Sequence, residues 1–186
     1  MNTPSTHSGP CSALLAGTSG LIGRALLALL LESPHYARVL ALLRHSAHDL
    51  PAHPKLHIDV VDFERLTALP AVDDVFIALG TTIKVAGSEA AFRRVDFDTV
   101  LATARLARAA GARRVIVVSA LGQPGRAGER WALRLLQPVL RFVPAGVRPI
   151  HAGDVASAML RAAIDAAPGL RILSSAQMQP RDQRRG

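Results

Sequence analysis

Three glycines at three-residue spacing stand near the start of this chain, between an apolar run and a leucine-rich run. The apolar run at 12–16 predicts a strand, and the leucine-rich run at 20–31 predicts a helix. Glycines here would permit a sharp turn, a close approach of the backbone to a pyrophosphate and close packing of helix on strand. A helix N-terminus adds free N–H groups and partial positive charge, so the segment indicates a dinucleotide site rather than a turn alone. The predicted pyrophosphate-binding residues are Gly17, Thr18, Ser19, Gly20, Leu21, Ile22 and Gly23.

Further segments with strand and helix patterns alternate along the chain. Strands are predicted at 38–43, 56–61, 74–79, 114–120 and 171–174, and helices at 89–110, 129–142 and 154–167. Alternation requires crossover connections, and these produce a parallel sheet with helices on both faces. The sequence therefore predicts an α/β fold with a doubly wound, Rossmann-like parallel sheet and flanking helices. We expect one domain at 12–176, between a disordered tail at 1–11 and a polar tail at 177–186.

Composition excludes several other classes of protein. The net charge is +8, but the basic residues are spread along predicted helices and aromatic residues make up only 4% of the chain, so nucleic-acid binding is not expected. The longest apolar run, 25–31, is far shorter than the roughly 20 residues that cross a bilayer. The first ten residues lack lysine and arginine, and no secretory leader is expected. One cysteine, Cys11, excludes an internal disulfide and suits a cytoplasmic location, and no metal-ligand spacing is present.

Cofactor choice is addressed by the residue that follows the second predicted strand. An NAD site usually places Asp or Glu about 20 residues beyond the glycines, where it binds the ribose hydroxyls. Arg44 holds this position. A guanidinium suits a 2′-phosphate by charge and by bidentate geometry, which favours NADP over NAD. A solvent-exposed arginine without a ligand is the alternative.

The ends of the remaining strands supply further candidate residues. Asp62 and Phe63 follow the third strand, where an adenine ring would lie; a helix-capping role for Asp62 is an equal alternative. Small residues end the fourth strand, and ligands of doubly wound sheets lie beyond the carboxyl ends of the strands. Ser119 ends the fifth strand and would face the same crevice; a hydroxyl that satisfies backbone groups at the strand end is an equal alternative. The candidates at the end of the fourth strand are Ala78, Leu79, Gly80 and Thr81.

Several motifs together resemble a known family. The segments GTSGLIG, LLR, DF, ALGTTIKVAGSEAAFRRVDFD, VIVVSALG and PIHAGDVASAML are similar to atypical short-chain dehydrogenase/reductases, in the branch of the Tat-interacting-protein-like and NmrA-like NAD(P)-binding proteins. The resemblance implies a Rossmann fold that binds NADP or NAD through the residues named above. It also implies that Ser119 matches the catalytic serine of the family.

The chain departs from the family where the catalytic segment is expected. The resemblance implies a Tyr-x-x-x-Lys motif after Ser-Ala-Leu-Gly, but the only tyrosine is Tyr36, and the lysines are Lys55 and Lys84. The segment with this motif and the next strand is missing, so a truncated C-terminal substrate lobe is expected. Without a placed general acid, carbonyl reduction loses about 10²–10⁴ in rate.

Two functions follow from this departure. One is an oxidoreductase-like protein with reduced or lost carbonyl reductase activity on an unknown small molecule. The other is a non-catalytic NADP(H)-sensing or protein-interaction module, in which the bare edge of the fifth strand pairs with another chain and forms a homodimer.

Overall fold

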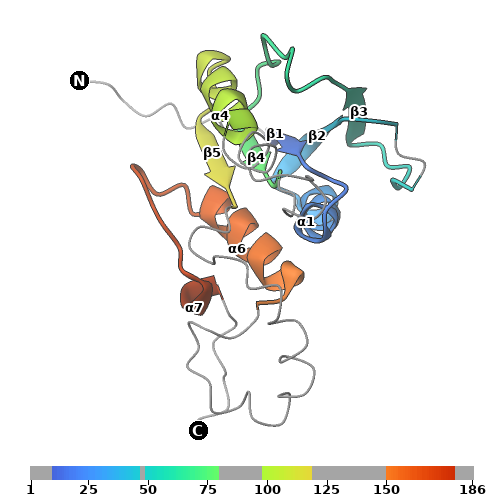
Figure 1. The fold of residues 1–186 in the computed structure, drawn as a ribbon. Helices are drawn as coiled ribbons and strands as arrows, with labels where there is room; N and C mark the ends of the chain where they lie inside the picture. The colour runs from blue at the N-terminus through green and yellow to red at the C-terminus, as the bar shows by residue number, and fades with distance from the viewer. Residues whose placement is uncertain (1–9, 47–48, 80–97, 119–149, 179–186) are drawn as a thin grey trace, which may run out of the picture.

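A parallel sheet forms the centre of the computed structural model, which describes residues 10–46, 49–79, 98–118 and 150–178. Its strand order is β3-β2-β1-β4-β5, so the chain steps outward from β1 first to one side and then to the other (Figure 1). This order is typical of a doubly wound Rossmann sheet and confirms the predicted fold class. The strands are β1 (Cys11–Ala16), β2 (Tyr36–Leu43), β3 (Leu56–Val60), β4 (Asp74–Ile77) and β5 (Arg114–Val117).

Helices cover both faces of the sheet (Figure 1). Helix α1 (Leu21–Glu32) packs with α6 (Ala152–Ile164) on one face, and α4 (Val100–Ala109) covers the other. Neighbouring residues of β1 accordingly enter different cores: Leu15 packs with the α1–α6 cluster, and Leu14 with the α4 cluster. This two-sided burial is why the strands read as continuous apolar runs rather than as alternating patterns.

The end of α4 follows its sequence signal. Gly111 has a φ of 86°, and its N–H donates to the Arg108 carbonyl at 3.1 Å, while the Ala112 N–H donates to the Ala107 carbonyl at 3.0 Å. These two bonds satisfy carbonyls that the helix end would leave free, and the left-handed backbone between them favours glycine.

The predicted strand at 171–174 is wrong. These residues have no regular structure, and the short helix α7 (Ser175–Met178) follows them. Leu170 and Ile172 are 92% and 81% exposed, so the apolar pattern there has no sheet partner to bury it. The first strand also begins one residue earlier than predicted, at Cys11, and β2 begins at Tyr36. Within the described ranges, no helix is both long and apolar enough to cross a membrane.

Candidate functional site

A cleft of about 660 Å³ lies at the carboxyl ends of β1, β2 and β4. This volume is within the range of small-molecule and cofactor sites, roughly 300–1,000 Å³. Its walls come from the glycine turn, from the end of β2 with the loop after it, and from the end of β4. The lining residues are Gly17, Thr18, Ser19, Gly20, Leu42, Leu43, Arg44, His45, Ser46, Asp49, Phe63, Ala78 and Leu79.

Glycine is needed at the three positions of the turn for different structural reasons. Gly17 has a φ of 102°, and a Cβ on it would lie 2.4 Å from the Ala78 carbonyl oxygen; a Cβ on Gly23 would lie 2.0 Å from the Gly17 carbonyl oxygen. Both positions therefore need glycine for backbone packing. Gly20 is different, since its nearest neighbour would be 3.8 Å from the added Cβ. Gly20 lines the cleft, so its small size leaves open space on the ligand side.

Polar groups at this turn fit an anionic ligand. Helix α1 begins after Gly20 with no side-chain cap and no acidic residue in its first turn, so its first N–H groups are available to a phosphate. The Thr18 hydroxyl is buried and has no hydrogen-bond partner within the described part of the chain. An unsatisfied buried hydroxyl costs about 1–3 kcal/mol, and a phosphate oxygen in the cleft would satisfy it.

Arg44 lies at the end of β2, on another wall of the cleft from the glycine turn, and contacts an aromatic ring. Its guanidinium carbon lies 6.0 Å from the centroid of the Phe63 ring, within the range of a cation–π interaction. Phe63 is buried and thus gives the exposed Arg44 a fixed surface to lie against. This contact holds a positive charge at the wall formed by the end of β2.

The other sequence candidates divide into four groups. Ala78 and Leu79 line the cleft. Leu21, Ile22 and Gly23 do not line the cleft: Leu21 is exposed, Ile22 packs on the core, and Gly23 is buried against the turn. The Asp62 carboxylate accepts a hydrogen bond from the Glu64 N–H at 2.9 Å, which is a local turn contact. Gly80, Thr81 and Ser119 lie outside the described residues.

Sequence reasoning missed two cleft residues after β2, Ser46 and Asp49. Asp49 forms an ion pair with Arg24, whose Nη2 lies 2.6 Å from the Asp49 Oδ2. The available signal was the position of Arg24 directly after Gly23, which places a basic side chain on the first turn of the helix that begins at the cleft.

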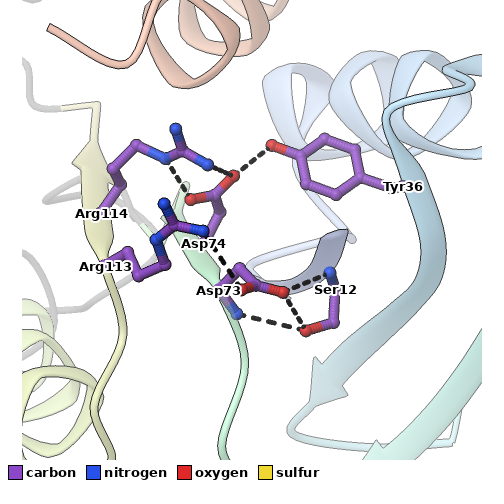
Figure 2. Close-up of polar contacts among 6 residues, drawn as sticks. All are labelled: Ser12, Tyr36, Asp73, Asp74, Arg113 and Arg114. Atoms are coloured by element: carbon purple, nitrogen blue, oxygen red, sulfur yellow. Dashed lines mark hydrogen bonds and ion pairs between the residues drawn. The ribbon is translucent and has the colours of Figure 1, made fainter. Parts of the chain in front are cut away.

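The only tyrosine lies at the amino ends of the strands, opposite to the cleft. Tyr36 begins β2 and Asp74 begins β4, and the Tyr36 hydroxyl donates to the Asp74 Oδ2 at 2.6 Å (Figure 2). Arg114, the first residue of β5, donates to both carboxylate oxygens of Asp74, with an Nη2–Oδ2 distance of 2.9 Å. Both Tyr36 and Asp74 are almost fully buried. Tyr36 is therefore a structural residue that cannot donate a proton in the cleft.

Alkaline titration should reveal this burial. Burial first, and then the hydrogen bond to Asp74, raise the pKa of Tyr36 well above its ordinary value. A raised folded-state pKa means that Tyr36 stabilises the fold fully below its unfolded pKa of about 10, and that this contribution is lost as the pH rises further. We expect no tyrosinate absorbance from native protein at a pH where the chain in guanidinium chloride is fully ionised. Tyrosinate in the native protein near pH 10 would contradict this.

A parallel sheet wound outward from β1, with a glycine-lined cleft at the strand ends, defines a dinucleotide-binding protein of the Rossmann type. A family model described as NAD(P)H-binding matches residues 17–162. The chain belongs to this NAD(P)H-binding family, which confirms the predicted resemblance to NAD(P)-binding Rossmann proteins of the atypical short-chain dehydrogenase/reductase type.

Individual relatives cover only part of the chain. It is 34% identical over 116 residues to protein HTATIP2 of Rattus norvegicus, which covers 60% of this chain and 48% of that protein. It is 33% identical over 112 residues to the mitochondrial protein FMP52 of Eremothecium gossypii, and this alignment covers 60% of this chain and 50% of that protein. The chain thus spans about half the length of these curated relatives. Among solved structures, an epimerase of Methanothermobacter thermautotrophicus has a TM-score of 0.47 at 18% identity, over 58% of this chain and 34% of that one.

Proposed function

We propose that the protein binds NADP(H) in preference to NAD(H) in the cleft beside the glycine turn. The observation that carries the proposal is that the open turn at Gly17–Gly20 and Arg44 line one cleft. The N–H groups of α1 and the Thr18 hydroxyl would bind the pyrophosphate. Arg44 would bind the 2′-phosphate, and Phe63 would line the adenine.

We further propose that carbonyl reductase activity is reduced or lost. When bound, NADPH would supply a hydride to a carbonyl carbon, and the alkoxide oxygen formed would need a proton from a placed acid. The hydroxyl of Tyr36 donates its hydrogen bond to Asp74 at the amino ends of the strands, away from the cleft. Ser119 remains our candidate for orienting a carbonyl, but a serine hydroxyl is a weak acid for this step. A cytoplasmic location stays a prediction from composition.

Nucleotide titration of a Gly20 variant tests the cofactor site. Aspartate is a favourable N-cap residue, and Gly20 has an extended backbone with a φ of −80° and a ψ of 163°, so Gly20→Asp should fold normally. Its carboxylate would stand where the pyrophosphate binds. We expect calorimetry to show that wild type binds NADP⁺ more tightly than NAD⁺, and that Gly20→Asp weakens both by about a hundredfold or more.

Two controls accompany this titration. Gly153→Asp places the same charge in open space on α6 and should leave affinity unchanged. Arg44→Ala should weaken NADP⁺ selectively. The cofactor proposal is withdrawn if Gly20→Asp, folded by circular dichroism, binds the nucleotides as wild type does.

A non-catalytic NADP(H)-sensing module is the second candidate function. It is supported by β5, which is the edge of the sheet within the described residues and exposes Val115 and Val117. An unpaired, apolar edge favours pairing with another chain, and we propose a homodimer or a protein partner there.

Turnover measurements distinguish the two functions. NADPH oxidation with aldehydes, ketones and quinones should be slow, about 10²–10⁴ below an enzyme with a placed acid. Residual turnover abolished by Ser119→Ala would favour the oxidoreductase. Complete absence of turnover, together with an NADPH-dependent change of mass in light scattering, would favour the sensing module.

A further inference from the structure

Asp49, which lines the cleft, forms an ion pair with Arg24 of another element. Arg24 lies on the first turn of α1, and Asp49 lies in the loop after β2. Their ion pair joins the phosphate-binding turn to the loop that follows Arg44. Arg24 also donates from Nε to the Ser19 carbonyl at 3.4 Å, so its guanidinium lies over the turn itself.

Asp49 brings a negative charge to the part of the cleft that also contains Arg44. Asp49, Arg44, His45 and Ser46 all line it. An unpaired carboxylate there would repel a 2′-phosphate and would accept a hydrogen bond from a 2′-hydroxyl. The pairing of Asp49 with Arg24 thus affects which ribose the cleft accepts.

The ion pair can be exchanged at low cost. The side chains of Arg24 and Asp49 are 57% and 55% exposed, and exposed pairs contribute little net stability. A phosphate dianion is a stronger partner for a guanidinium, because it offers more acceptor oxygens and more charge. Arg24 can therefore leave Asp49 when such a ligand arrives. The freed Asp49 carboxylate then opposes the phosphate and lowers the NADP⁺ affinity that Arg24 and Arg44 provide.

We infer that Arg24 and Asp49 form an exchangeable pair that sets the choice between NADP and NAD. When a 2′-phosphate enters the cleft, Arg24 leaves Asp49 and binds the phosphate together with Arg44. When the ribose carries a free 2′-hydroxyl, Asp49 accepts its hydrogen bond. This inference rests on the proposed function and adds two residues that determine cofactor specificity.

Titration of NADP⁺ and NAD⁺ into wild type and two variants tests the inference. Arg24→Gln should weaken NADP⁺ about tenfold, as expected for the loss of one charge-assisted hydrogen bond, and leave NAD⁺ equal or tighter. Asp49→Asn should tighten NADP⁺ several-fold and weaken NAD⁺. The same opposite shifts should occur with adenosine 2′,5′-bisphosphate and 5′-AMP, because the discrimination lies at the ribose.

A matched control is the exposed pair of Arg171 and Asp165, which are 51% and 57% exposed and do not line the cleft. Arg171→Gln should leave both affinities unchanged. Arg24→Lys keeps the charge and should retain part of the preference for NADP⁺. Thermal unfolding of each variant verifies that the fold persists.

The outcomes separate this inference from the cofactor proposal. The exchangeable pair alone is refuted if wild type binds nucleotide and Gly20→Asp weakens binding as expected, but Arg24→Gln and Asp49→Asn shift the preference by less than twofold or in the same direction. If wild type binds neither nucleotide, both ideas are refuted.

Discussion

Gly17→Ala and Gly23→Ala should each destabilise the protein by about 3 kcal/mol or more. At Gly23 the new Cβ would lie 2.0 Å from one backbone oxygen and 2.8 Å from a carbonyl carbon, so the backbone itself must shift. At Gly17 a comparable clash combines with a φ of 102°, where L residues are strained. Urea unfolding monitored by circular dichroism measures both losses.

Two other glycines distinguish the cost of a steric clash from the cost of a positive φ. Gly111 has a φ of 86° and open space around a Cβ, whereas Gly153 has open space on helix α6 and no positive φ. Gly111→Ala should therefore cost only about 1–2 kcal/mol from strain, and Gly153→Ala should be neutral or stabilising by up to about 1 kcal/mol. Equal stability changes at all four glycines would refute the packing argument.

Asp74→Ala should cost about 3–5 kcal/mol. Asp74 is fully buried, and its loss leaves the Arg114 guanidinium, whose side chain is only 18% exposed, without its carboxylate. The Tyr36 hydroxyl also loses its acceptor. Thermal or urea unfolding measures the loss.

Tyr36→Phe is the matched smaller change, because it removes one hydrogen bond and leaves the Asp74–Arg114 pair intact; about 1–2 kcal/mol is expected. Asp62→Asn, at an exposed turn, should change stability by less than about 0.5 kcal/mol. In the Asp74→Ala background, Tyr36→Phe should cost almost nothing. A full additive cost there would show that the two residues do not act together.

The sequence predicts the sheet well because its strongest signals are local. Runs such as 38–43 are apolar throughout, and this pattern arises where helices cover both faces of a parallel sheet. The glycine spacing likewise predicts the turn, since Gly17 and Gly23 are fixed by contacts within the first strand–helix unit and the end of β4.

What the sequence does not predict depends on contacts between distant segments. The bonds of Asp74 to Tyr36 and Arg114 join residues 38 and 40 positions apart, and the Arg24–Asp49 pair joins α1 to the loop after β2. The short run 171–174 has strand-like composition, but composition does not show whether a sheet edge is near. Asp62 accepts a hydrogen bond within a local turn, whereas the sequence left open an adenine contact and a helix-capping role.

The buried carboxylate network and the glycine-lined cleft occupy opposite rims of the same sheet. Substitutions that change ligand preference at the cleft therefore leave the hydrogen bonds of Asp74 with Tyr36 and Arg114 intact. In this arrangement the cofactor preference can change, or the catalytic activity can be lost, while the protein keeps a stable native state.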